Sequence, residues 1–151
     1  MAEVRRLRPG DDAVAREMFE LMADVFGEDE EGGADGDPLR DDDVMSLLER
    51  EDFWAVVATE GERVVGGLTA HALPMTRNRS TELFIYDLAV RADRQRRGIG
   101  RTLVTELLAL ARSSGIDTAF VPAENEDMHA LDFYRAVGGV PSPVMFFTFS
   151  R

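Results

Sequence analysis

The stretch "LFIYDLAVRADRQRRGIGRTLVTELL", residues 83–108, joins an apolar run to a helical pattern through a turn rich in arginine and glycine. The apolar run belongs to residues 81–90, whose length and composition predict a long strand. After Gly98 the apolar residues recur every four positions, which predicts a helix with one buried face: Ile99, Leu103, Leu107 and Ala111. The stretch therefore predicts a strand, a positively charged turn and a helix that begins at the glycines.

This turn has the composition of an anion site. A helix N-terminus exposes backbone N–H groups and the positive end of the helix dipole, which together favour a bound phosphate. Gly98 and Gly100 give a diphosphate access to the backbone. Three arginines add guanidinium donors: Arg96, Arg97 and Arg101. The spacing from Gln95 is Gln-x-x-Gly-x-Gly, which is neither the dinucleotide fingerprint nor a P-loop, and the chain has no lysine. The alternative is a helix start with a solvated run of charge.

The rest of the chain alternates between helical and strand patterns. Strands are predicted at residues 3–8, 53–60, 63–73, 117–123 and 143–150, and helices at residues 11–27, 41–52 and 128–139. Gly61-Glu62 between two of these strands indicates an antiparallel hairpin, so the sheet is mixed. We expect a single domain of the α/β class over residues 1–151. The apolar last strand is expected either to mediate a homodimer or to lie inside the sheet.

Composition restricts the partners. The formal net charge is −12, which opposes nucleic-acid binding and favours a cationic partner. There is no cysteine, and His71 and His129 are the only histidines, so no metal site is expected. No apolar run approaches the ~20 residues that span a bilayer, and the N-terminus lacks a signal-peptide pattern, so no membrane association and a cytoplasmic location are expected.

Charge is distributed unevenly along the sequence. Residues 28–43 hold nine acids against Arg40, whereas residues 91–101 hold five arginines against Asp93. This asymmetry predicts two sites of opposite sign, one for an anion and one for a cation. The alternative for the acidic stretch is a solubilising loop.

Residues 83–108, the opening "VRRLRPGD" (4–11), "RVVGG" (63–67) and "ALDFYRAVGG" (130–139) resemble the GNAT superfamily of N-acetyltransferases. The resemblance implies the GNAT fold, in which a mixed, mostly antiparallel sheet is flanked by about four helices. It also implies acetyl-coenzyme A as co-substrate, with its diphosphate on the Gln95–Gly100 loop. The residues implied in binding it are Leu88, Ala89, Val90, Gln95, Arg96, Arg97, Gly98, Ile99, Gly100, Arg101 and Tyr134.

A narrower resemblance is to the aminoglycoside 3-N-acetyltransferases that act on gentamicin-type antibiotics. It rests on "ELFIYDLAV", "VVGGLTAHALP", "FVPAENEDMHALDFYRAVG" and "VMFFTF", and the sequence departs from the family at Glu124, Pro122 and His129. The resemblance implies acetylation of the 3-amino group of an aminoglycoside, and hence antibiotic resistance. The alternatives are a GNAT enzyme for another small polyamine or a protein N-terminus, and a non-catalytic acyl-CoA-binding module.

The resemblance also implies roles for single residues. Tyr134 matches the tyrosine that protonates the departing thiolate, and its alternative is a core aromatic. Glu124 takes the place of a family aspartate and is the candidate base, while capping of a helix is the favoured role of Asp127. The residues expected to face a cationic substrate are Glu28, Asp29, His71, Asp87, Glu124, Glu126 and Asp127.

Overall fold

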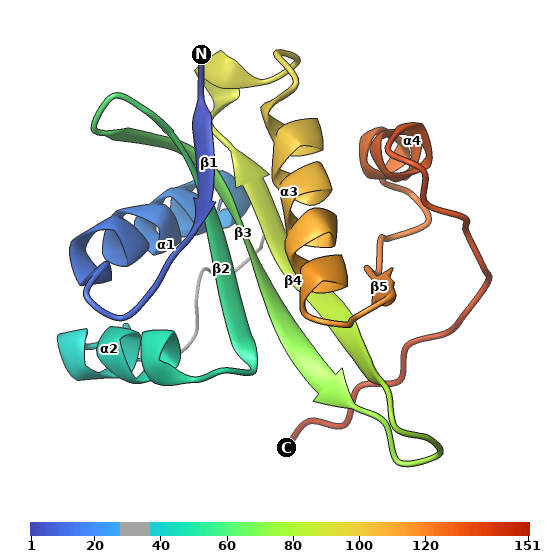
Figure 1. Cartoon of the computed structure of the whole chain (residues 1–151). Coiled ribbons are helices and arrows are strands. Elements are labelled where there is room, and N and C mark those ends of the chain that lie inside the picture. The colour runs from blue at the N-terminus through green and yellow to red at the C-terminus, as the bar shows by residue number, and fades with distance from the viewer. Residues whose placement is uncertain (28–36) are drawn as a thin grey trace.

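The computed structural model describes residues 1–27 and 37–151, and its centre is one five-stranded sheet. The strands lie in the order β1 (Glu3–Arg6), β2 (Phe53–Glu60), β3 (Arg63–Pro74), β4 (Thr81–Val90) and β5 (Thr118–Phe120) (Figure 1). The first four strands are antiparallel to their neighbours and β5 is parallel to β4. This arrangement confirms the predicted mixed, mostly antiparallel sheet.

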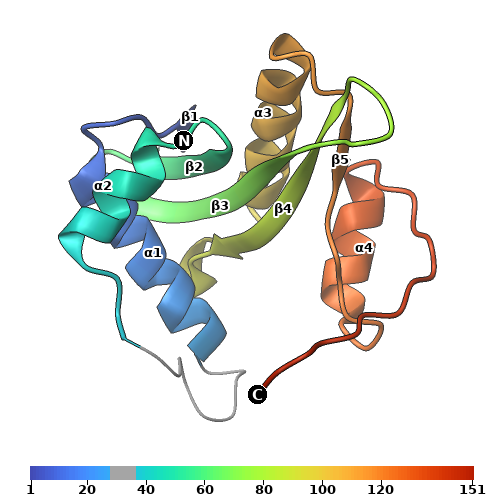
Figure 2. The same cartoon turned by 90° about the horizontal axis from the view of Figure 1, so that it is seen from below.

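Helices cover both faces of the sheet (Figures 1 and 2). On one face lie α1 (Asp12–Gly27) and α2 (Asp41–Glu49), and on the other lies α3 (Ile99–Ser113). The fourth helix, α4 (Met128–Ala136), lies beyond α3, and a short 3-10 turn, η1 (Ala92–Arg94), joins β4 to α3. Within the described residues, no helix combines the length and apolarity that crossing a bilayer requires.

The core consists of two apolar clusters separated by the sheet. In β2, Trp54, Val56 and Ala58 pack toward α3, whereas Phe53, Ala55 and Val57 pack toward α1 and α2. The strand is therefore buried on both faces, which explains why its sequence is a continuous apolar run without polar alternation. The predicted face of α3 is confirmed, since Leu103 and Leu107 are fully buried in the first cluster.

A bulge in β4 changes which residues face each cluster. The register of β3 and β4 shifts between Thr69 and Ala70, and Tyr86 is the extra residue on β4. Before the bulge the odd-numbered residues of β4 pack toward α3, and after it the even-numbered residues do. A bulge places two consecutive side chains on the same side of a strand. Tyr86 and Asp87 accordingly both line the α1 side.

The predicted strand at residues 143–150 is wrong. This whole segment is described, and it contains no strand and no sheet pairing. The preceding strand β5 is only three residues long, and the chain after α4 leads away from it (Figure 1). An apolar extended run forms a strand only where an edge receives it, and the segment finds none in its own chain.

A close approach of α1 to β3 depends on Gly67. A Cβ atom there would overlap the Sδ and Cγ atoms of Met18, a fully buried residue of α1. We expect Gly67→Ala to lower the free energy of unfolding by about 1–3 kcal/mol, because the added methyl group overpacks the core. Denaturant unfolding measures this change. The cost should shrink in a Met18→Ala background, since the two sites are coupled.

Gly27→Ala serves as the matched control, because a Cβ at Gly27 meets no atom within 4 Å and its φ is ordinary. It should change stability by less than about 0.5 kcal/mol. Equal costs of Gly67→Ala in the wild-type and Met18→Ala backgrounds would contradict the packing explanation.

Candidate active site

The N-terminus of α3 has no side-chain cap. Gly98 is its N-cap residue, with φ of +82°, and no side chain bonds to the first turn. The first N–H groups of a helix lack intrahelical acceptors, so this terminus presents donors to an anion. Glycine at 98 is required by its left-handed backbone, a conformation that Arg96 also adopts with φ of +64°.

Gly100 has a different structural reason. A Cβ atom at this position would lie 3.2 Å from two ring carbons of Phe133 on α4. Gly100 therefore lets α4 approach the first turn of α3. Both glycines are predicted from the sequence to give a ligand access to the backbone. The structure adds a conformational reason for Gly98 and a packing reason for Gly100.

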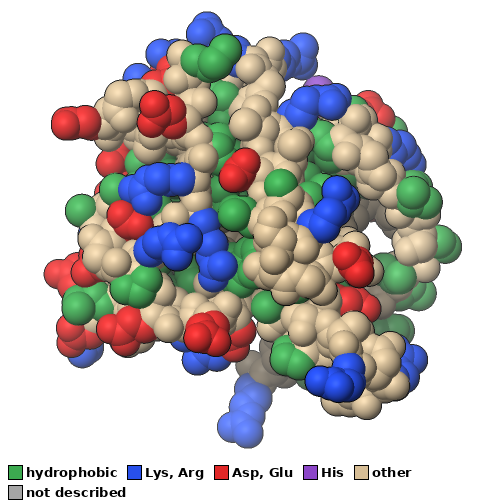
Figure 3. All heavy atoms as spheres, in the orientation of Figure 1, with side chains coloured by type: hydrophobic (Ala, Val, Ile, Leu, Met, Phe, Trp, Pro, Cys, Tyr) green, Lys and Arg blue, Asp and Glu red, His purple; other side chains and the backbone are tan. Residues whose placement is uncertain are grey.

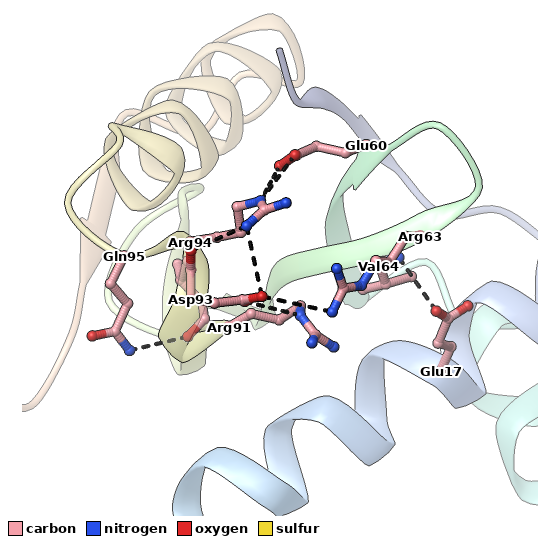
Figure 4. Close-up of polar contacts among 9 residues, drawn as sticks. Glu17, Glu60, Arg63, Val64, Arg91, Asp93, Arg94 and Gln95 are labelled. Atoms are coloured by element: carbon pink, nitrogen blue, oxygen red, sulfur yellow. Dashed lines mark hydrogen bonds and ion pairs between the residues drawn. The ribbon is translucent and has the colours of Figure 1, made fainter.

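Two arginines of the loop are engaged in ion pairs that fix η1 (Figure 4). Arg94 Nε lies 2.7 Å from Glu60 Oε1 at the end of β2. Asp93 lies within 4 Å of the guanidinium groups of Arg63, Arg91 and Arg94. These contacts hold the turn against the β2–β3 hairpin.

The remaining arginines differ in their availability. Arg101 donates a hydrogen bond to the carbonyl of Ala136 at 3.2 Å and so links α3 to α4. Arg96 and Arg97 are exposed, and among the described residues neither takes part in a hydrogen bond or an ion pair. They are the two guanidinium groups left for an anion at the helix terminus.

Gln95 fixes the other end of the loop. Its side-chain amide donates a hydrogen bond of 3.1 Å to the carbonyl of Val90, the last residue of β4 (Figure 4). Gln95 is predicted from the sequence to bind the cofactor, and in the structure its side chain bonds to the backbone of β4.

One edge of β4 is open over its last part. β5 pairs only with Glu82–Phe84, so residues 85–90 of β4 have no strand beside them on that edge. On their other edge Leu88, Ala89 and Val90 pair with β3. Apart from the Val90 carbonyl, which Gln95 engages, backbone donors and acceptors on the open edge are therefore available to an extended, amide-containing ligand.

A cleft of about 510 Å³ lies on the α1 side of the sheet. Its apolar wall comes mainly from α1 and α2, and its polar groups come from β3 and β4: Thr69, His71, Tyr86 and Asp87. The ring of His71 lies 5.5 Å from that of Phe53 and 5.9 Å from that of Tyr86. Among the described lining residues Asp87 is the only acid, so the expected carboxylate lining is not found in this part of the cleft.

Two residues that flank the undescribed part of the acidic stretch lie at this cleft. Gly27 and Leu39, on either side of residues 28–36, both line it. The predicted substrate contacts Glu28 and Asp29 fall outside the described residues.

Tyr134 is half-buried on α4, and its hydroxyl is electrostatically coupled to β4. Burial is the main cause that raises the pKa of Tyr134, and the charges of Asp127 and Asp87 raise it further. Both effects favour the neutral phenol. Tyr134 therefore keeps its proton at neutral pH and is able to donate it to a developing anion.

The other predicted site residues are dispersed. Asp127 Oδ1 accepts a hydrogen bond of 3.0 Å from the N–H of Ala130, which confirms that it caps α4. Glu124 and Glu126 are exposed in the loop before α4 and do not line the cleft. In the described ranges no three of the His, Asp and Glu side chains form a group suited to a metal ion.

The structure also shows site features that the sequence analysis missed. The bulge that pairs Tyr86 with Asp87 on one face lies inside a run that looks like a regular strand. The Arg94–Glu60 contact joins residues 34 positions apart. The one signal in the sequence was the excess of arginine over Asp93 in residues 91–101, which indicates that some of these arginines pair with acids elsewhere in the chain.

An uncapped helix terminus, an open strand edge and an adjacent cleft form an arrangement suited to an extended phosphorylated ligand beside a second substrate. The chain belongs to the acetyltransferase (GNAT) family, whose model matches residues 15–138.

Individual relatives agree with this assignment. The chain is 30% identical over 102 residues, or 68% of its length, to the uncharacterised N-acetyltransferase YvbK of Bacillus subtilis (strain 168), and the match spans 61% of that protein. It is similar to the crystal structure of the aminoglycoside acetyltransferase meta-AAC0020 in complex with sisomicin, with a TM-score of 0.91 and 28% identity over 99% of this chain and 96% of the other. For the aminoglycoside acetyltransferase HMB0005 the TM-score is 0.90, with 31% identity over 100% and 99% of the two chains. Both of these enzymes come from uncultured soil metagenomic samples.

The raised pKa of Tyr134 is directly testable. The chain has two tyrosines, so Tyr86→Phe leaves Tyr134 as the only phenol. We expect its absorbance titration to have a midpoint above the ordinary value of about 10. Asp127→Asn should lower that midpoint, because it removes a negative charge while asparagine still caps the helix.

Asp132→Asn is the control, since Asp132 lies on the exposed side of the same helix and does not contribute to the shift. A midpoint at or below the ordinary value in Tyr86→Phe would refute the coupling of Tyr134 to its surroundings.

Proposed function

We propose that this protein transfers an acetyl group from acetyl-coenzyme A to an amine, and that the amine is the 3-amino group of an aminoglycoside. The observation that carries the proposal is the open edge of β4 between two features. At one end is the uncapped terminus of α3 with Arg96 and Arg97, and at the other are Asp87 and Tyr134.

The residues of the chain fit coenzyme A. The N–H groups at the start of α3 and the guanidinium groups of Arg96 and Arg97 suit its diphosphate. The open edge at Leu88–Val90 suits the amide groups of its pantetheine arm, and a backbone N–H there would polarise a thioester carbonyl. When bound, acetyl-coenzyme A supplies the activated acetyl group.

The two proton transfers are assigned to side chains that influence each other. As the amine nitrogen bonds to the acetyl carbon and the carbon–sulfur bond breaks, a carboxylate accepts the proton of the amine and Tyr134 gives its own to the sulfur. Asp87 is favoured as the acceptor because it lines the cleft and its charge reaches the Tyr134 hydroxyl. Glu124 is the acceptor that the family resemblance implies.

Three observations support an aminoglycoside as the amine. The similar enzyme meta-AAC0020 was solved with sisomicin, and the net charge of −12 attracts a polycation. Gly27 and Leu39, which flank residues 28–36, line the cleft, and the acids of residues 28–43 would steer such a substrate toward it. The aromatic rings of the cleft offer surfaces for the apolar faces of sugar rings.

Coenzyme A binding tests the anion site. Arg96→Ala and Arg97→Ala should each weaken binding of coenzyme A about tenfold, because each removes a charge-assisted contact to phosphate. Calorimetry measures the dissociation constant. Pantetheine, which lacks the diphosphate, should bind the variants and the wild type equally, and Arg77→Ala, an exposed arginine of the β3–β4 loop, is the control. Unchanged coenzyme A affinity in both loop variants would exclude this site.

Product analysis tests the reaction and its substrate. With acetyl-coenzyme A we expect mass spectrometry and NMR to find sisomicin and gentamicin acetylated once, at the 3-amino group. Spermidine and a peptide amine should react more slowly. Asp87→Asn should lower kcat about 100-fold or more if Asp87 is the base, whereas Glu124→Gln should change it by less than about threefold because of the exposed position of Glu124.

Each outcome of the product analysis has a distinct meaning. The opposite order of the two variants would assign the base to Glu124. Faster turnover of spermidine would retain the acetyltransferase and reject the aminoglycoside. Coenzyme A binding without turnover of any amine would reject the enzyme in favour of a binding module.

A further inference from the structure

Aromatic side chains continue from the cleft across the sheet. His71 on β3 and Tyr86 on β4 line the cleft, and the ring of Phe84 lies 5.7 Å from that of Tyr86. The ring of Phe120 on β5 lies a further 5.0 Å from that of Phe84. Tyr86, Phe84 and Phe120 together form the aromatic row, which leads from the cleft to the last strand of the sheet.

Strand register explains why these rings share one face. Phe84 is paired with His71 on β3 and with Phe120 on β5. Leu83 and Ile85, on either side of Phe84, pack toward α3, so the ring of Phe84 points to the α1 side. The row therefore lies on the same side of the sheet as the cleft.

The row is open to solvent. Tyr86 is 62% exposed, Phe120 is 41% exposed, and Phe84 is half-buried. A single exposed ring is ordinary on a protein surface. Three rings in contact that continue a cleft form an extended surface for a ligand that the cleft holds in part.

Carboxylates lie at both ends of the row. Asp87 follows Tyr86 and lines the cleft. Glu82 lies two residues before Phe84 on the same face of β4, and among the described residues its side chain has no hydrogen bond or ion pair. At about 3.3 Å per residue, the two acids are roughly 15 Å apart along the strand. A single sugar ring is shorter than this separation, whereas a molecule of linked rings can reach both acids.

The other side of the sheet has a different distribution of charge. On the α3 side, acidic and basic side chains are both scattered over the surface (Figure 3). Such a mixture does not attract a polycation to one place. The row, with an acid at each end and apolar rings between them, matches a ligand that has amines on separate rings.

We propose that the aromatic row and Glu82 bind an outer sugar ring of the aminoglycoside, while the central ring presents its amine to Asp87. This inference rests on the proposed function. The face of a sugar ring that carries only C–H bonds is apolar, and stacking on an aromatic ring removes it from water. An ammonium group on the outer ring forms a charge-assisted contact with Glu82.

The row distinguishes rigid rings from flexible amines. Spermidine has no ring face to stack, and ordering its chain along the row would cost conformational freedom. A stacked outer ring also fixes the orientation of the central ring, which keeps the reacting amine near Asp87. The row is thus a determinant of substrate specificity and takes no part in proton transfer.

Substrate kinetics tests the aromatic part of the row. Phe120→Leu keeps an apolar side chain but removes the ring, and we expect it to raise the KM for sisomicin about fivefold with kcat changed less than about twofold. Phe120→Tyr keeps the ring, so it is the matched control and should behave as the wild type does. The kcat/KM for 2-deoxystreptamine, which is the central ring alone, should be the same for all three proteins.

Salt dependence tests the role of Glu82. Glu82→Gln should raise the KM for sisomicin about threefold or more at low ionic strength, and the difference from the wild type should shrink as salt is added. Glu62→Gln changes an exposed acid in the turn between β2 and β3 and is the control, so it should leave the KM unchanged.

The outcomes separate this proposal from the proposed function. Normal KM values for sisomicin in both Phe120→Leu and Glu82→Gln, with acetylation intact, would overturn the row and retain the acetyltransferase. An equal loss with 2-deoxystreptamine would place the effect at the reacting ring and also overturn the row. If calorimetry detects no binding of sisomicin to the wild type in the presence of coenzyme A, the aminoglycoside and the row are both rejected.

Discussion

The early end of the pairing between β4 and β5 is the constraint on which the site depends. The two strands are joined only over Glu82–Phe84, and beyond this point β4 keeps β3 on one edge and has no strand on the other. A buried strand edge must find partners for its backbone groups. The open edge leads from the cleft, where the β4 bulge presents Tyr86 and Asp87, to the turn before α3. One irregularity in the sheet therefore leaves an unpaired edge that leads from the cleft to the uncapped terminus of α3.

The arginines of the turn before α3 fall into two groups, those paired with acids of the protein and those left available to a ligand. Asp93 and Glu60 engage Arg91 and Arg94, and these contacts hold η1 against the hairpin. If all arginines of the turn were unpaired, their charges would repel one another. If all were paired, none would be available to an anion. On the far side of the open edge, burial and nearby carboxylates keep Tyr134 neutral. The same electrostatic rules thus leave unpaired guanidinium groups in one region and a neutral phenol in the other.

Most of the fold could be predicted from the sequence because its signals are local. The periodicity of α3, the Gly61-Glu62 turn between β2 and β3 and the apolar run of β2 each depend on residues close in the chain, and the structure confirms them. The turn rich in arginine and glycine before α3 could be recognised for the same reason. The pairing of Arg94 with Glu60 and the coupling of Tyr134 to Asp87 were not, because each joins residues far apart in sequence. The prediction of a strand at residues 143–150 was wrong for a related reason. This segment has the composition of a strand, but a strand also needs an edge to receive it.

The sequence by itself determined the order of helices and strands as far as α4, the charged turn at the start of α3 and the family to which these patterns are similar. These properties follow from side-chain period, backbone preference and charge over short stretches. Only the tertiary structure decided which face of β4 carries Asp87, which arginines remain available and which ring a side chain at position 100 would crowd. Those outcomes depend on register, on contacts across the sheet and on the approach of α4 to α3. Each is fixed by packing between distant segments, and no local pattern in the chain records it.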